Sequence, residues 1–408
     1  MTDHPAIDST IGEYLSLALA MERVFPGFVD GYHGPPALKE AVEAGPEPAA
    51  EELLARAEAL HDAIAGAGLD AGRTAFLTAQ TRAMVAVCRM LTGETLPYTE
   101  EVATLFDIEP AHTPEAVFDA AITELDGLLP GTGDVRARMV EWRNRTIVTP
   151  EMARQLIDRI ADETRRRTEQ LLDLPLVESV EFAMVQDQPW SGYNWFLGGG
   201  KSRVEINTDL PIRASGLLDL IAHEAYPGHH TEHALKEHDL YRKQGFGEYA
   251  IQLINTPECV ISEGIATLAS SFIFAEGEGE RWMAEEIYPL ASIPADPERE
   301  HRIGTASSAL RAVGANAALL MHDEGASDDE VVEYFMRYGL DDEERARHRL
   351  GFIKSPLWRA YIFTYHAGRD LLGAWLNQAT DNADRTARIR TLMLEPITPG
   401  VIAGELGG

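Results

Sequence analysis

The sequence contains only two cysteines among its 408 residues, Cys88 and Cys259, and they lie far apart along the chain. A small secreted domain held by several disulfides is therefore excluded, because such domains are dense in cysteine. The first ten residues, MTDHPAIDST, also lack the basic start and the apolar core of a signal peptide. We therefore expect a cytoplasmic protein without disulfide bonds.

Basic residues are scarce as well, since 35 lysines and arginines stand against 66 aspartates and glutamates, a formal net charge of -31 at pH 7. Such a charge repels nucleic acid and anionic membrane surfaces, so neither is expected as a partner. The most apolar long stretch, residues 249–275, is interrupted by Pro257, Glu258 and Glu263. These interruptions favour a buried helix over a membrane span. The sequence leaves the oligomeric state open.

Helical patterns dominate the chain. The triplet Thr-Pro-Glu precedes an amphipathic run three times, at residues 113–115, 149–151 and 256–258. Threonine caps free backbone amides, proline is tolerated at the first helical position, and glutamate favours the positive end of the helix dipole. Each triplet therefore predicts the start of a helix.

The helical pattern is interrupted in residues 177–207. There the segments VESVEFAMV, YNWFLGGG and SRVEIN are rich in β-branched and aromatic residues. This composition predicts three short strands in a small antiparallel sheet, and residues 202–207 could offer an edge to an extended peptide. The fold class is therefore mainly α. We expect an N-terminal helical region, residues 1–148, and a second region, residues 149–408, although the two can form one continuous unit.

Four of the thirteen histidines lie in one segment, HEAYPGHHTEH, which starts at His223. In the zinc motif HExxH, two histidines one helical turn apart bind the same ion. Here Pro227 occupies the second position and begins a Pro-Gly pair. Two residues looped out of the helix at this pair would bring His229 to the place of the second ligand. His230 is the alternative, because on a regular helix it lies near the face of His223.

A catalytic zinc site needs a third protein ligand and an open position for water. Glu263 lies in the apolar helix predicted to begin at residue 256, where an unpaired carboxylate is costly to bury. A cation about 2 Å away would remove that cost, so Glu263 is the expected third ligand of one Zn²⁺ per chain. A structural ion pair is the alternative explanation for Glu263.

The order His-Glu, then Gly-His, then Glu-Gly-x-Ala resembles the gluzincin metallopeptidases, and residues 262–266, SEGIA, fill the slot of their Asn-Glu-Gly-Phe-Ala run. The eight residues HEAYPGHH are more similar still to a bacterial family of unknown function with an HExxPGHH signature, regarded as metallopeptidase-like. Weaker similarity to that family continues at His322 and at Tyr365. The resemblance implies a helical metallopeptidase-like fold with its small antiparallel sheet before the metal-binding helix.

The same resemblance implies roles in catalysis. Glu224 cannot easily bind the ion beside its neighbour, but it can accept a proton from the water that zinc activates. A donor must then stabilise the tetrahedral oxyanion, and Tyr365 is the first choice, with His322 or His366 as substitutes. We therefore predict a zinc-dependent hydrolase that acts on a peptide or amide substrate. Tyr365 could also belong to a packed aromatic face.

Two other functions stay open. A non-catalytic protein could keep the metal and bind peptides without cutting them. A di-iron carboxylate protein would need paired Glu-x-x-His motifs, and one is present, at residues 298–301. Arg359 and Arg369 could receive a substrate carboxylate, although solvated helix positions explain them as well.

Overall fold

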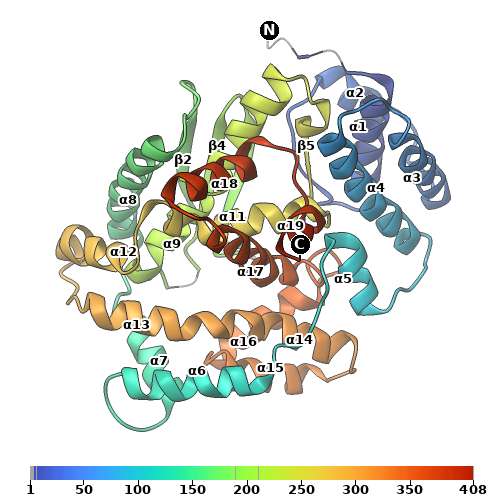
Figure 1. Cartoon of the computed structure of the whole chain (residues 1–408). Helices are drawn as coiled ribbons and strands as arrows, with labels where there is room; N and C mark the ends of the chain where they lie inside the picture. Colours follow the sequence, from blue (N-terminus) through green and yellow to red (C-terminus); the bar gives the residue numbers. More distant parts are fainter. Residues whose placement is uncertain (1–3, 6, 189, 210, 408) are drawn as a thin grey trace.

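The computed structural model of the chain describes residues 4–5, 7–188, 190–209 and 211–407. Helices surround two small sheets (Figure 1). The elements up to residue 144, drawn in blue and teal, are α1 (Ser9–Glu22), β1 (Val29–Tyr32), α2 (Pro36–Ala44), α3 (Ala50–Ile64), α4 (Ala71–Leu91), α5 (Tyr98–Phe106), α6 (Glu115–Leu128) and α7 (Val135–Asn144).

The middle of the chain supplies strands β2 to β5 and, at the centre of the molecule, helix α11 (Figure 1). Its elements are α8 (Pro150–Leu171), β2 (Ser179–Val185), β3 (Gly192–Gly198), β4 (Lys201–Asn207), η1 (Ala214–Gly216), α9 (Leu217–Glu224), α10 (His229–Leu235), η2 (Lys236–Lys243), η3 (Gly247–Ala250), β5 (Ile251–Leu253) and α11 (Pro257–Ile273).

The remainder of the chain is helical and packs below and in front of α11 in the view of Figure 1. Its elements are α12 (Glu278–Trp282), η4 (Met283–Ile287), η5 (Tyr288–Ala291), α13 (Pro297–Ser307), η6 (Ser308–Ala312), α14 (Val313–His322), α15 (Asp328–Tyr338), α16 (Glu343–Lys354), α17 (Ile362–Asn377), α18 (Asn382–Leu394) and α19 (Pro399–Leu406).

The three helix starts predicted from the Thr-Pro-Glu triplets are confirmed to within one residue, as α6, α8 and α11. The predicted cap forms at Thr149, whose side chain accepts a hydrogen bond from the Met152 amide. It does not form at Thr256, whose hydroxyl donates instead to the Leu253 carbonyl at 3.2 Å. Proline therefore marks these helix starts more dependably than threonine does.

The mainly α fold and the three strands expected before the histidine segment are confirmed. β3 and β4 pair antiparallel, as predicted, but β2 runs parallel to β4, because the second strand of the hairpin lies next to β2. The three-stranded sheet, in the order β2-β4-β3, is therefore mixed. The prediction of an edge at residues 202–207 is wrong, since β4 lies in the centre and β3 forms the edge.

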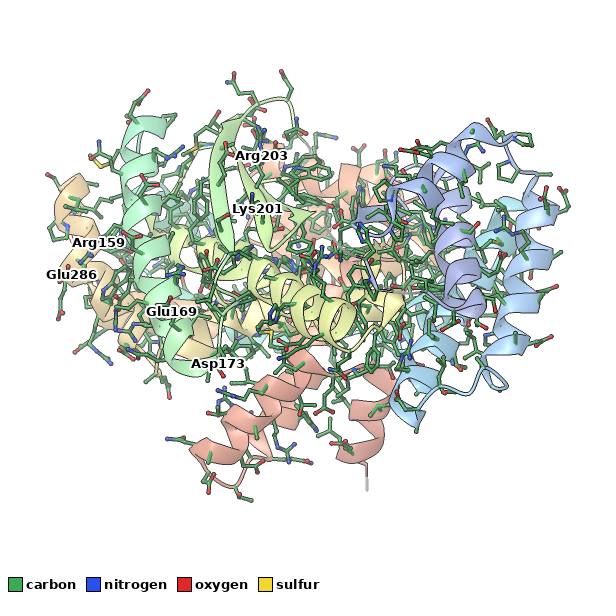
Figure 2. The ribbon with its side chains drawn as sticks, turned by 90° about the horizontal axis from the view of Figure 1, so that it is seen from above. Arg159, Glu169, Asp173, Lys201, Arg203 and Glu286 are labelled. Carbon is green, nitrogen blue, oxygen red and sulfur yellow. The ribbon has the colours of Figure 1, made fainter. Side chains whose placement is uncertain are left out.

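Side chains alternate along β4 as the strand pattern requires. Lys201 and Arg203 are exposed, whereas Ser202 and Val204 between and after them are buried (Figure 2). The buried face packs with the apolar side of α8 and with α9 in one core cluster, so the sheet supports the helix that carries the first histidine.

The first half of the chain is joined to the second by a strand pair and by a large buried core. β1 pairs antiparallel with β5, directly before α11. The rings of Phe76 and Tyr249 stack at 5.0 Å, and those of Phe118 and Tyr338 lie 5.5 Å apart, all within one apolar cluster. This core crosses residue 148, while the division of the chain into two regions stays a prediction.

Among the described helices, no single one has the length and hydropathy of a membrane span. One bent pair, Pro257–Ile273 with Glu278–Ala291 at 64°, meets these criteria together by length and composition only.

Candidate metal centre

The Pro-Gly pair interrupts the histidine segment. α9 ends at Glu224 and α10 begins at His229, with the interruption between them. The Gly228 amide donates to the carbonyl of Ala222 at 2.9 Å, and a Cβ atom on residue 228 would overlap the carbonyl oxygen of His223. Only glycine fits this close approach. The predicted displacement is confirmed as a break between two helices, and it brings the rings of His223 and His229 to 4.8 Å.

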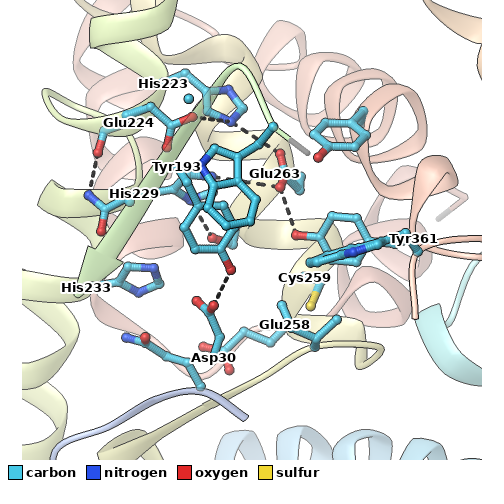
Figure 3. Close-up of a pocket in the computed structure, with 18 of the residues that line it drawn as sticks. Asp30, Tyr193, His223, Glu224, His229, His233, Glu258, Cys259, Glu263 and Tyr361 are labelled. Atoms are coloured by element: carbon cyan, nitrogen blue, oxygen red, sulfur yellow. Dashed lines mark hydrogen bonds and ion pairs between the residues drawn. The ribbon is translucent and has the colours of Figure 1, made fainter. Parts of the chain in front are cut away.

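Glu263 reaches the same point from α11, as Figure 3 shows. Its Oε2 atom lies 3.5 Å from Nε2 of His223, and its Oε1 atom lies 3.8 Å from Nε2 of His229. Two ligands of a tetrahedral zinc ion, each about 2.1 Å from it, lie about 3.4 Å apart. The observed spacing is therefore close to that of a zinc site.

The donor set of this cluster fits a metal ion. Oε2 of Glu263 is buried and has no hydrogen-bond partner among the described residues. A buried carboxylate oxygen without a partner is unfavourable, and a cation would satisfy it. Ligand atoms of His223, Glu224 and His229 also lie within 4.8 Å of one another. Glu263 lies outside that grouping, but each of its oxygens faces one of the two histidines, and its Oε2 atom has no other partner among the described residues.

The electrostatics favour a positive charge at this point. Burial and, to a smaller extent, the charge of Glu263 raise the pKa of Glu224 to about 8. Burial likewise raises the pKa of Glu263 to about 8, against the hydrogen bond from Tyr361. Burial lowers the pKa of His229 to about 4 and that of His223 well below its usual value. Neutral imidazoles beside two crowded carboxylates are suited to bind a cation.

A chain of buried hydrogen bonds orients His229. Its Nδ1 atom lies 3.0 Å from Oγ of Ser262, whose hydroxyl donates to Glu232 at 2.6 Å. Burial opposes ionisation of Glu232, but Lys236, with Nζ 2.7 Å away, holds its pKa at about 2. Because the single Ser262 proton goes to this carboxylate, Oγ accepts from Nδ1–H of His229. The Nε2 atom of His229 therefore presents a lone pair to the cluster.

His230, the alternative second ligand, is turned away from the cluster. Its Nδ1 atom lies 2.8 Å from Oγ of Ser202, and its Nε2 atom lies 2.9 Å from Oε2 of Glu178. The ring is fully buried, and both nitrogens are already engaged. The geometry therefore favours His229 over His230 as a metal ligand.

A pocket opens over the cluster, bounded by the two sheets and by α9, α10, α11 and α17 (Figure 3). Glu224 lies on its wall next to β3, where the Asn194 side chain donates to the backbone carbonyl of Glu224 at 2.6 Å. Asp30 of β1 enters from the other side and accepts a hydrogen bond from the Tyr193 hydroxyl. Burial raises the pKa of Asp30 to about 6. Aromatic side chains line much of the remainder, namely Trp190, Tyr193, Phe352, Trp358, Tyr361 and Tyr365.

Two tyrosines reach the pocket from α17, Tyr361 at its N-cap and Tyr365 within the helix. Tyr361 donates to Oε1 of Glu263 at 2.8 Å. Tyr365 also lines the pocket, and its hydroxyl forms no hydrogen bond with another described residue. Burial raises the pKa of Tyr365 well above its usual value, so the hydroxyl keeps its proton. The expected donor is therefore in reach of the pocket, with its ring packed against Tyr361 at 5.7 Å.

Glycines let α17 approach α11 at this place. A Cβ atom on Gly264 would lie 2.8 Å from the carbonyl oxygen of Gly368, and one on Gly368 would lie 2.9 Å from the amide nitrogen of Gly264. Real side chains do not tolerate such distances, so each position requires glycine. The backbones of the two helices therefore touch directly beside Glu263.

The prediction that places His322 at the catalytic site needs correction. Its Nε2 atom lies 2.7 Å from the carbonyl oxygen of Ile353, its ring packs on Tyr98, and it does not line the pocket. α14 ends at this residue, outside the elements that bound the pocket. His366 packs on Phe363 and does not line the pocket either.

The motif expected of a di-iron protein lies apart from the cluster. His301 pairs with Glu280 at 3.1 Å and with Glu276 at 3.4 Å. Among the described residues, the groups whose ligand atoms lie within 4.8 Å of one another do not include Glu298 or His301. No second centre accompanies residues 298–301 there.

Several residues of the site were missed by the sequence analysis. Asp30 and Tyr193 come from strands far from the histidine segment, and no local pattern marks them. Ser262 could have been found, because it precedes Glu263 on a buried helix where a hydroxyl needs a partner. Tyr361, one helical turn before Tyr365, was not predicted as a residue of the site.

No family model matches the chain, and no curated protein matches its sequence. Among solved structures, a candidate lipoprotein from Colwellia psychrerythraea aligns over 91% of this chain and 68% of its own, with a TM-score of 0.57 and 16% identity. A candidate lipoprotein of unknown function from Shewanella oneidensis aligns over 91% and 76%, with a TM-score of 0.50 and 13% identity. These two share the fold of this chain. The M32 carboxypeptidase from Deinococcus radiodurans R1 aligns over 96% and 93%, with a TM-score of 0.41 and 12% identity. The resemblance to the HExxPGHH family stays a prediction.

Proposed function

We propose that the chain is a zinc-dependent hydrolase of peptide or amide bonds. The observation that carries this proposal is the convergence of His223, His229 and Glu263, with a buried oxygen of Glu263 that has no partner among the described residues. Three ligands of this kind leave one position open, as in catalytic zinc sites. When bound, zinc supplies a Lewis acid that acidifies a water molecule and polarises a carbonyl group.

Glu224 is the general base in this proposal. Its Oε1 atom lies 4.0 Å from Nε2 of His223, beside the cluster and on the wall of the pocket. The carboxylate accepts a proton from the attacking water, whose oxygen adds to the carbonyl carbon of the substrate. Glu224 then passes the proton to the amide nitrogen, the C–N bond breaks, and an amine and a carboxylic acid are released.

Tyr365 stabilises the oxyanion that forms when water adds. Its protonated hydroxyl lines the same pocket and is free to donate. A positioned donor of this kind typically contributes about 10²–10³ in rate. The edge strand β3, of which residues 192–194 line the pocket, supports an extended peptide as the substrate, because an edge strand can pair with a backbone.

The proposal is tested with the metal content of the purified chain and a mixed peptide library. We expect about one zinc ion per chain and cleavage that a chelator abolishes, whereas two irons would favour a di-iron protein. Glu224→Gln should keep the metal and lose at least about 10²-fold in rate. Glu181→Gln, an exposed position on β2, is the matched control.

Bound zinc without any cleavage of the library would refute the hydrolase and favour a metal-containing protein that binds peptides. Full activity of the Glu224→Gln variant would refute the assignment of the base.

A further inference from the structure

A second, larger cavity adjoins the candidate metal centre on the other side of His223. Figure 1 shows α13 passing below α9 and α17, and the cavity lies among these helices and α11. His223 lines both this cavity and the pocket over the cluster. We call one set of the residues that line the larger cavity the arginine cleft, defined by Asp219, His223, Thr267, Arg311, Arg369 and Arg385.

The arginine cleft continues the pocket along two helices. On α17, Arg369 follows Tyr365 by four residues, so both lie on one face of the helix. On α11, Thr267 follows Glu263 by the same interval. The first member of each pair lines the pocket and the second lines the cleft. A substrate held at the cluster can therefore extend along this face toward the arginines.

Three arginines of the cleft lack acidic partners. Arg311, Arg369 and Arg385 form no ion pair with any carboxylate of the part of the chain that the structure describes. Arg369 donates to the carbonyl of Thr267 at 2.6 Å, and burial, then the charge of Arg311, lowers its pKa. The charges of Asp219 and Asp370 offset part of this lowering of the pKa.

The other arginines on the cavity wall are already neutralised. Arg143 pairs with Asp341 at 3.5 Å, and Arg145 pairs with Glu300. Unpaired arginines are unexpected in a chain of formal charge -31, where carboxylates outnumber basic groups almost twofold. Guanidinium groups left without carboxylates in a cleft are suited to receive an anion, most often in a forked arrangement.

The pocket over the cluster differs from the cleft in its charged side chains. Four carboxylates line it, and none of its lining residues among those described is a lysine or an arginine; these carboxylates are Asp30, Glu224, Glu258 and Glu263. The guanidinium groups that can attract an anionic group of a substrate therefore lie in the cleft. The two cavities together fix the direction in which a charged substrate lies.

We propose that the arginine cleft binds a carboxylate of the peptide substrate and so orients it across the metal centre. This inference rests on the proposed hydrolase function and names the substrate class: peptides with a negative charge on the side of the scissile bond that faces α17. The carboxylate comes either from the chain terminus or from an aspartate or glutamate side chain, and both have the same chemistry toward arginine.

The test uses three tripeptide pools, one with free carboxyl termini and without acidic residues, the same pool amidated, and an amidated pool that contains aspartate and glutamate. Cleavage of each is measured with the wild type, Arg311→Gln and Arg369→Gln. The matched control is Arg302→Gln on α13, which is exposed and does not line the cleft. Arg369 also donates a hydrogen bond to Thr267, so the Arg369→Gln variant could fail to fold. The Arg311→Gln variant then provides an independent test.

We expect kcat/KM for one of the charged pools to fall at least about tenfold in each cleft variant, and to stay unchanged in the control. Dependence on the free terminus identifies a terminal carboxylate, and dependence on the acidic pool identifies a side chain. Equal activity of the cleft variants and the wild type on all three pools would overturn the inference.

Binding of the same pools to the Glu224→Gln variant, measured by calorimetry, separates this inference from the proposed function. Binding of a charged pool that is weakened by Arg311→Gln supports the cleft even if the wild type cleaves nothing. If no pool binds, or if the arginine substitutions leave the affinity of the charged pools unchanged, the inference about the cleft is overturned, whether or not cleavage occurs.

Discussion

Replacing Ser262 with alanine tests how His229 is held. The hydroxyl accepts from Nδ1 of His229 at 3.0 Å, in a partly buried bond, and donates to Glu232 at 2.6 Å, in a buried one. Without the hydroxyl, the Nδ1 proton has no acceptor in its place. The tautomer with the proton on Nε2 then becomes more favourable. This tautomer opposes metal binding, because Nε2 must be unprotonated to bind a metal.

The magnitude follows from the role of the partner. Loss of a hydrogen bond that orients a metal-binding histidine costs about 10–100-fold in metal affinity, or about 1.4–2.7 kcal/mol. We expect the Ser262→Ala variant to fall in this range, because Lys236 still neutralises Glu232 and limits the damage to the histidine. Zinc affinity is measured by competition with a chromophoric chelator, and circular dichroism checks that the variant is folded.

Ser202→Ala is the matched control. It removes a hydroxyl that contacts Nδ1 of His230 at 2.8 Å, the neighbouring histidine that is turned away from the cluster. The reasoning is refuted if Ser262→Ala binds zinc as tightly as the wild type. A larger loss in Ser202→Ala than in Ser262→Ala would make His230 the second ligand.

Two further predictions concern catalysis and stability. Tyr365→Phe should lower kcat by about 10²-fold and leave zinc affinity unchanged, since its hydroxyl touches no ligand; an equal loss of zinc would assign it to the metal site. For Glu178, burial raises the pKa, but hydrogen bonds from three neighbouring side chains hold it at about 2 in the folded chain. The ionised group therefore stabilises the fold above about pH 4.5 and loses that effect as the pH falls toward 2. Glu178→Gln should lower the thermal unfolding temperature at pH 7 and lower it much less at pH 3, and a constant difference would contradict this.

Local patterns in the sequence predicted the parts of the fold that depend on neighbours along the chain. The helix starts at α8 and α11, the three strands before α9 and the break at Pro227 all follow from residue types within a few positions. The pairing of β2 with β4 was not predictable in this way, because either neighbour satisfies the same alternation.

The candidate site divides along the same line. His223, His229 and Glu263 carry a spacing and a burial cost that the sequence displays, and the structure brings them together. His322 was predicted only from a weak similarity to a family motif. In the structure α14 places it against the carbonyl oxygen of Ile353, away from the pocket. Asp30 reaches the pocket through the pairing of β1 with β5, a contact between residues more than 200 positions apart, which no local pattern encodes.

The direct contact of α11 with α17 at Gly264 and Gly368 has a consequence for motion during turnover. With no layer of side chains between them, the two backbones cannot slide or tilt without steric overlap, so they behave as one rigid block. This block carries Glu263, Tyr361 and Tyr365. The geometry of these three side chains relative to one another is therefore already set when the chain folds. Any closure around a substrate must come from the opposite wall, where β1 and β3 carry Asp30 and Tyr193.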